Sequence, residues 1–187
     1  AIGLVAATFT FSTALTQLVP HLENEGYSLT QASLILSLTA LFGMAGKIIF
    51  GYMAERIPVR YTVIISLIGQ ALALAIIVTV PRSPMIWLFI PVYGVAFGGL
   101  GSLISLLVQD TFGLRHYASI QGLVGMASVV AFFGGPLMAG MLFDSTESYR
   151  STFIILAVLF IAGSVILTQA RPPKGVETAM REALGHS

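Results

Sequence analysis

Long apolar stretches separated by short polar segments dominate the chain. Six runs of at least twenty residues contain no Lys, Arg, Asp or Glu, and they cover residues 1–22, 26–46, 61–81, 83–109, 116–143 and 151–170. A helix rises ~1.5 Å per residue, so about 20 residues cross ~30 Å of hydrocarbon. Strands of a membrane barrel would instead alternate in polarity over about 10 residues. The pattern therefore predicts six transmembrane helices, at about 1–21, 29–53, 60–80, 85–108, 118–142 and 151–169.

The connections between these spans are short and carry most of the charge, which predicts an all-α membrane protein with antiparallel neighbours. Residues 1–170 form the transmembrane unit, and 171–187 form a polar tail. Lys and Arg are enriched on cytoplasmic loops. One side of the predicted bundle holds Arg56, Arg60, Arg115, Arg171, Lys174 and Arg181, and the other holds Arg82 and Arg150. We therefore expect a multi-pass protein of the bacterial inner (plasma) membrane with a cytoplasmic C-terminus.

Composition narrows the functional class. The chain is 56% hydrophobic and 9% charged, against about 25% charged in ordinary soluble domains. A net charge of +1 provides no basic surface for nucleic acid, and the absence of cysteine excludes disulfides and thiolate metal sites. The predicted spans contain no Ser–His or paired-Asp arrangement, so the sequence predicts no enzyme, metal site or cofactor.

The two halves of the chain share a weak repeat. The stretch Ala40–Gly43 is echoed by Ala131–Gly134, and Arg60 with its following residues by Arg150 with its own, at offsets of 91 and 90 residues. The copies lie on the second and fifth spans. This offset of three spans is an odd number, so the copies point in opposite directions. Inverted three-plus-three repeats are a feature of secondary transporters. The chain also begins inside a predicted span, and we expect it to be the second half of a longer protein.

The connection between the second and third spans resembles the signature loop of the major facilitator superfamily. The matching residues are Gly51, Glu55, Arg56 and Arg60, with Glu55 where Asp is commoner and Pro58 where Gly is usual. The resemblance implies a twelve-helix transporter in which these residues form a conformational latch. Ion pairs of this kind hold one packing arrangement and break in another.

Three further segments look like signatures of monocarboxylate porters. They are the run Phe143–Phe153, the loop Asp110–Arg115 and the segment Leu18–Leu22. The chain therefore resembles the C-terminal six-helix half of a monocarboxylate-porter-like or oxalate/formate-antiporter-like transporter. The resemblance implies alternating access, with a cavity lined by the first and fourth spans, flanked by the second and fifth. It also implies two partners besides the lipid bilayer, namely an N-terminal half and a small-molecule substrate.

Lys47 is the strongest candidate for substrate contact, because it is the only charge well inside a predicted span. A lysine facing a cavity could bind a carboxylate, although it could also extend to the membrane surface or act in gating. The other candidates are polar or aromatic residues that share helix faces on the first and fourth spans, namely Phe9, Thr13, Gln17, Tyr93 and Phe97.

The fifth span carries small residues and a proline suited to tight packing or bending, namely Gly134, Gly135, Pro136 and Gly140. The sequence thus predicts a secondary transporter of small organic solutes, with monocarboxylate or dicarboxylate anions as the expected substrates. Two alternatives stay open. One is a transporter of the same superfamily for a neutral or drug-like substrate, and the other is a non-transporting membrane sensor or structural domain.

Overall fold

The structure is a computed structural model, and it describes residues 2–79, 84–114, 117–146 and 148–169, with the side chains of residues 2–8, 11 and 169 left aside. The described residues form helices and short connections, without a strand among them. The helices are α1 (Ile2–Asn24), α2 (Leu29–Arg56), α3 (Val59–Thr79), α4 (Ile86–Gly98), α5 (Leu100–Phe112), α6 (Tyr117–Thr146) and α7 (Arg150–Gln169). The predicted tail 171–187, together with Arg82 and Arg115, lies outside the described residues.

Five described helical stretches are long and apolar enough to cross a membrane, with α4 and α5 counted together. The predicted span 1–21 falls on the helix α1, which is not among these five. The all-helical membrane architecture is therefore confirmed. Most helices run a few residues beyond the predicted spans, because helical backbone continues past the apolar segment into the polar connections. Thus α2 continues to Arg56 and α6 to Thr146.

The fourth span differs from its prediction. A single helix was expected over 85–108, but the structure has two helices that meet at Gly99 and together extend to Phe112. A Cβ added at Gly99 would lie 2.5 Å from Cβ of Phe50 on α2, so the interruption occurs where a side chain has no room. A charge-free run in the sequence gives only the length of an apolar segment, so it cannot show that the helix is interrupted within that segment.

Local signals explain where helices begin and end. Ser28 and Gln31 form a reciprocal capping box at the start of α2, with bonds of 3.3 Å and 3.1 Å between each side chain and the other residue's backbone N–H. The helix stops before the extended residue Ile57, which precedes Pro58. α5 ends at Gly113, whose φ of +72° suits glycine.

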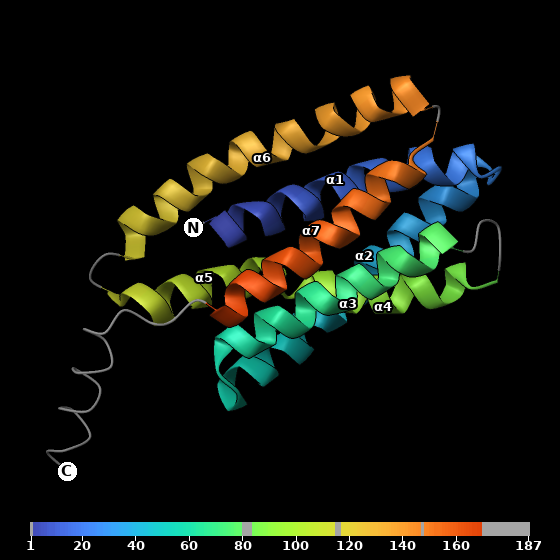
Figure 1. Cartoon of the computed structure of the whole chain (residues 1–187). Helices are drawn as coiled ribbons and strands as arrows, with labels where there is room; N and C mark the ends of the chain where they lie inside the picture. The colour runs from blue at the N-terminus through green and yellow to red at the C-terminus, as the bar shows by residue number, and fades with distance from the viewer. Residues whose placement is uncertain (1, 80–83, 115–116, 147, 170–187) are drawn as a thin grey trace, which may run out of the picture.

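The helices pack as an elongated bundle (Figure 1). α2 packs mainly on α4, α1 packs on α6 and α7, and α3 packs on both α4 and α7. α3 is the most enclosed of the apolar stretches and α6 the least. The core lies between α1, α3, α4 and α7, and its largest fully buried side chains include Phe89, Tyr93, Phe153 and Phe160.

With α4 and α5 taken as one span, successive spans run in opposite directions, so their connections fall at two ends (Figure 1). The α2–α3 and α5–α6 connections lie at one end, together with the C-terminal end of α7. The α1–α2 and α6–α7 connections lie at the other end, together with the α3–α4 connection. We call these the 57–58 end and the 25–28 end, respectively.

Candidate functional site

Lys47 lies on an uncovered flank of α2. The buried stripe of this helix runs through Thr39, Gly43, Gly46 and Phe50, which face α4. Lys47 is about 40° around the helix from Gly43 and exposed, and it lies nine residues, about 13 Å, before the end of α2 at Arg56. In the described part of the chain, it is the only charged side chain this far inside a long apolar helix.

The flank that carries Lys47 differs in chemistry from the strip next to it on α2. Met44 and Ala40 are its exposed neighbours towards the start of α2, and Ser37 and Ser33 continue the same flank further along the helix. About 100–140° around the helix from Lys47, large apolar residues are exposed, namely Leu34, Leu41, Ile48 and Tyr52. An apolar face suits lipid, whereas a small and polar face suits contact with protein or with water in a cavity.

The first-span candidates lie along the contact between α1 and α6. Thr13 is fully buried and donates a hydrogen bond of 2.7 Å to the carbonyl oxygen of Phe9. A Cβ at Gly135 would collide with Oγ1 of Thr13, and one at Gly134 would lie 3.7 Å from the Phe9 ring. Gln17 is half-buried one turn further along α1. Phe9 and Thr13 thus form part of a helix seam, with Gly135 as the point of closest approach.

The other two predicted packing positions on α6 have different surroundings. A Cβ at Gly140 would meet nothing within 4 Å among the described residues. Pro136 lies inside α6, which continues through it as one helix from Tyr117 to Thr146. Tight packing on α6 is therefore concentrated at Gly135 in the described structure.

The fourth-span candidates form an aromatic column on α4. Tyr93 stacks between Phe89 and Phe97, with ring centroids 5.2 Å and 5.7 Å apart. Tyr93 is buried, and its hydroxyl has no hydrogen-bond partner among the described residues. Phe97 is half-buried and approaches Gly43 of α2. Tyr93 is therefore inside the bundle, while Phe97 lies at the α2–α4 boundary.

Glycines make the contact between α2 and α4 unusually close. A Cβ at Gly98 would collide with the carbonyl oxygen of Gly43, and one at Gly46 with that of Val95. At Gly94 it would lie 2.6 Å from the carbonyl oxygen of Thr39. Small residues allow membrane helices to approach in this way. The sequence shows the glycines of the fourth span, but only the structure separates Gly98, which is in the seam, from Gly101, which faces open space.

The predicted latch residues make two contacts at the 57–58 end. The Arg56 guanidinium lies over the Tyr52 ring, 4.2 Å from its centre. Arg60 donates a hydrogen bond to the Thr168 carbonyl in the last turn of α7. Neither contact involves a carboxylate, and Glu55 has no ion pair within the described chain.

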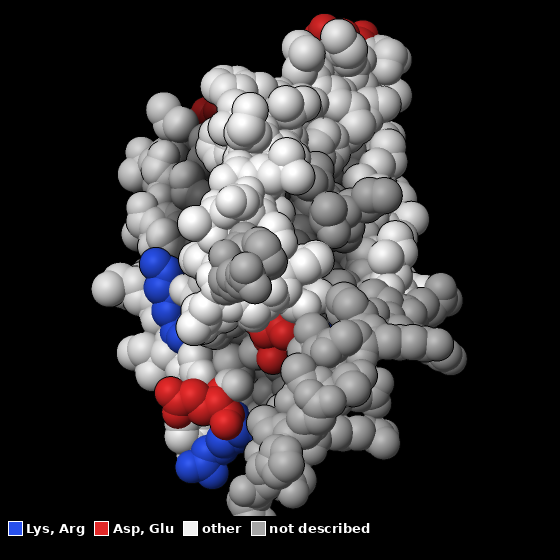
Figure 2. All heavy atoms as spheres, turned by 90° about the vertical axis from the view of Figure 1, so that its left-hand side faces the viewer, with Lys and Arg blue, Asp and Glu red and all other residues white. Residues whose placement is uncertain are grey.

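Gly51, the remaining latch residue, has no atom within 4 Å of the position its Cβ would take. Figure 2 looks onto this end of the bundle and shows basic and acidic residues gathered low on the face. The described loop therefore presents charge and open space rather than a closed ion pair.

Two of the segments that resemble monocarboxylate porters meet at the 25–28 end. His21 of α1 is buried, and its ring lies 4.7 Å from that of Phe153 at the start of α7. Phe143 and Tyr149 stack at 4.3 Å across the α6–α7 connection. In the sequence these residues belong to two separate segments, Leu18–Leu22 and Phe143–Phe153. In the fold, aromatic packing between α1 and α7 brings the two segments together.

The sequence pattern does not predict the buried hydrogen bonds between α3 and α4. Ser66 donates to the Ala96 carbonyl oxygen at 2.6 Å, and the Gln70 amide donates to Ser66 Oγ at 3.2 Å. Gln70 is fully buried. The signal available in the sequence was the four-residue spacing of Ser66 and Gln70, which places them on one helix face.

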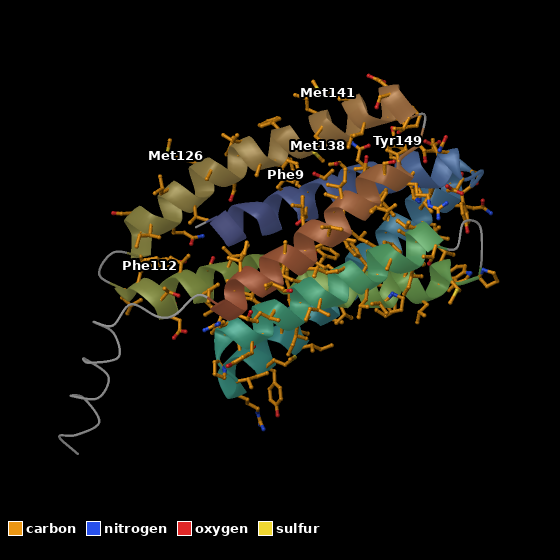
Figure 3. The ribbon with its side chains drawn as sticks, in the orientation of Figure 1. Phe9, Phe112, Met126, Met138, Met141 and Tyr149 are labelled. Carbon is orange, nitrogen blue, oxygen red and sulfur yellow. The ribbon has the colours of Figure 1, made fainter. Side chains whose placement is uncertain are left out.

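The outer faces of α2 and α6 are largely uncovered. On α6, Val130, Phe133 and Met126 are each more than 70% exposed. Figure 3 shows Met126 and Met141 directed away from the bundle, and Met138 on the side of α6 that is nearer to α1. Among the described residues, no group of three or more His, Asp or Glu side chains could hold a metal ion.

Comparison with known proteins places this arrangement in a family. The sequence model of the Major Facilitator Superfamily matches residues 1–186. Monocarboxylate transporter 12 from Rattus norvegicus is 25% identical over 178 residues, which are 93% of this chain and 37% of that protein. The human protein of the same name is 25% identical over 175 residues, covering 91% and 34%. Monocarboxylate transporter 13 from Rattus norvegicus is 24% identical over 152 residues, covering 80% and 36%.

The chain thus spans a little over a third of the length of these relatives. The family match and the long apolar helices identify an integral, multi-pass membrane protein. The chain belongs to the Major Facilitator Superfamily and resembles the monocarboxylate transporters.

Proposed function

We propose that this chain is the C-terminal six-helix half of a secondary active transporter that moves small carboxylate anions by alternating access. The observation that carries the substrate class is Lys47, a cation exposed about 13 Å inside α2 on the flank with small and polar neighbours. A charge at that depth is costly in lipid and is maintained where it faces a cavity or a ligand. A carboxylate is the substrate group that such a cation would bind most strongly.

The packing pattern supports an inverted three-plus-three repeat. With α4 and α5 taken as one span, the second span packs on the fourth, and the fifth packs on the first. The third packs on the fourth, and the sixth packs on the first. Each contact therefore has a counterpart when the first three spans are exchanged with the last three, as an internal two-fold axis requires.

Equivalent residues occupy the two matching seams. Phe97 approaches Gly43 on the second span, and Phe9 lies beside Gly134 on the fifth. Gly43 and Gly134 are the pair that the sequence repeat aligns at an offset of 91. These contacts support a common ancestry for the two sets of three helices.

The partner of the uncovered faces would be an N-terminal half of the same protein. The exposed apolar surface of α6 is larger than a soluble protein leaves open, and the relatives are more than twice as long as this chain. In the proposed transporter the Lys47 flank of α2 and the inner side of α6 border the solute path. Glu55 and Gly51 then contact the other half when the latch closes.

The excess of Lys and Arg at the 57–58 end favours a cytoplasmic position for that end and for the C-terminus. The relatives named above come from rat and human, so they give no support to a bacterial membrane. We therefore propose the orientation but not the organism's membrane.

The test is uptake of labelled monocarboxylates and dicarboxylates by the full-length protein in proteoliposomes. Lys47→Gln removes the charge, and we expect at least a tenfold loss of transport for carboxylates, since a charged hydrogen bond contributes about 1.5–3 kcal/mol. Lys47→Arg retains the charge and should preserve part of the activity.

Arg150→Gln is the matched control, because Arg150 is an exposed cation at a helix end. The proposal is contradicted if Lys47→Gln transports carboxylates with unchanged affinity, or if Arg150→Gln causes the same loss. Protein recovery and monodispersity of each variant separate a transport defect from misfolding.

One observation favours a second candidate, a transporter for neutral or drug-like solutes. Phe9 and Phe97 are half-buried on the two helices expected to line the cavity, and the described spans offer no second deep cation. Uptake of an uncharged aromatic solute that is insensitive to Lys47→Gln would favour this alternative. Absence of transport for both solute classes would favour a sensor or structural role.

A further inference from the structure

A shallow groove of about 330 Å³ opens at the 25–28 end, where α2 and α4 begin. It is lined by Tyr27, Gln31, Leu34, Ile35, Pro84, Ile86 and Trp87. None of these residues belongs to the proposed solute path, and no part of the function proposed above uses them. The glycine seam lies further along both helices, so α2 and α4 are in close contact there and leave a groove only near their first turns.

The walls of the groove change from apolar to aromatic and polar. Ile35 and Ile86 form its buried floor, at 4% and 9% exposure, whereas Trp87 is 60% exposed at its rim. Leu34 belongs to the apolar side of α2, which faces away from Lys47. The groove is therefore open towards the side of the bundle that suits lipid.

Its depth in the membrane matches a lipid headgroup and the first carbons of a chain. Gln31, Leu34 and Ile35 lie within the first seven residues of α2, and Ile86 and Trp87 are the first two residues of α4. Tryptophan and tyrosine concentrate at this level of membrane proteins, where an amphipathic ring meets the headgroups. An acyl chain could then rest on Ile35 and Ile86.

The charges near the groove favour a cationic headgroup. The turn that leads into Tyr27 carries Glu23 and Glu25, and the described residues lining the groove include no Lys or Arg. Quaternary ammonium groups are recognised by aromatic side chains through cation–π attraction. Gln31 uses Oε1 to accept the Ser28 N–H, which leaves its amide nitrogen to donate to a phosphate oxygen.

We propose that this groove is a binding site for a choline phospholipid, with the ammonium group between Tyr27 and Trp87 and one acyl chain on the Ile35–Ile86 floor. The site is independent of transport and is formed by the first turns of α2 and α4 together with residues that directly precede them. It would secure the membrane-boundary ends of these two helices against the bilayer.

The single tryptophan of this chain, Trp87, provides a direct probe. The full-length protein is placed in nanodiscs of phosphatidylglycerol with increasing brominated phosphatidylcholine, and Trp87 quenching is measured against a Trp87→Phe background. We expect quenching to saturate well before brominated phosphatidylcholine makes up half of the lipid, because the site is selective. In the reverse experiment, brominated phosphatidylglycerol in phosphatidylcholine should quench no more than its bulk fraction.

Tyr27→Leu should lower the preference for phosphatidylcholine about two- to fivefold, the effect of losing one exposed cation–π contact of about 0.5–1 kcal/mol. Tyr61→Leu is the matched control, because Tyr61 is 55% exposed on α3 at the opposite end of the bundle. Counting the phosphatidylcholine retained by the purified protein in native mass spectrometry gives a readout that does not use Trp87. In that measurement Trp87→Leu should also lose bound lipid.

Quenching that follows the bulk lipid fraction in both directions would overturn the proposal. So would a preference for phosphatidylglycerol, or an equal effect of Tyr27→Leu and Tyr61→Leu. Unchanged lipid retention in a monodisperse Trp87→Leu protein would likewise refute it.

Discussion

At the scale of single residues, the glycines differ sharply in what they permit. Gly98 is pressed against the backbone of Gly43, whereas nothing lies within 4 Å of the corresponding position at Gly101. We predict that Gly98→Ala destabilises the protein by about 1–3 kcal/mol, since overfilling a close contact forces the backbones apart. Gly101→Ala should be neutral or stabilising by up to about 1 kcal/mol, because alanine favours the helix. Thermal unfolding of the two variants in one detergent gives the comparison, and equal melting temperatures would refute the seam.

Some of the candidate residues can be identified from the sequence alone, and others only from the fold. Lys47 stood out because a charge inside an apolar run is visible in one dimension. The burial of Tyr93 and the partnership of Ser66 with Ala96 depend on which helix lies opposite, and a single sequence does not state that. His21 on α1 and Phe153 on α7 are separated along the chain by the five helices α2 to α6, so only the fold brings their rings together.

At the scale of helices, the arginines of the signature loop divide into two roles. Arg60 donates to a carbonyl at the C-terminal end of α7, where the helix dipole favours a cation. The Arg56 guanidinium instead lies over the ring of Tyr52 on its own helix. We predict that Arg60→Gln increases hydrogen exchange in the last turn of α7, while Arg56→Gln leaves that turn protected. Comparable exchange in both variants would show that Arg60 does not hold α7.

The same scale explains the one clear departure in the elements. The pattern of charges located the fourth apolar segment but presented it as one helix, and Gly99 divides it. Gly99 lies where Phe50 of α2 leaves no room for a side chain, so the need for glycine at this position follows from packing and not from local polarity. The other long helices each cover a charge-free segment, because Lys, Arg, Asp and Glu are costly in hydrocarbon, and their ends extend a few residues into the polar connections.

At the scale of the whole molecule, two kinds of uncovered surface remain. Ala75 lies on the exposed side of α3, beside Leu72 and Ile68, and this side suits lipid. Ala40 lies on the exposed flank of α2 two turns before Lys47, and this flank would border the solute path in the proposed transporter. In the proposed transporter, water and carboxylate reach the second surface but not the first.

The chain has no cysteine of its own, so single cysteines at these positions can be tested directly against a cysteine-free background in the full-length protein. We expect a water-soluble thiol reagent to modify Ala40→Cys, and a transported carboxylate to slow that modification, while Ala75→Cys stays unmodified. Equal modification at the two positions, or a resistant Ala40→Cys, would contradict the account.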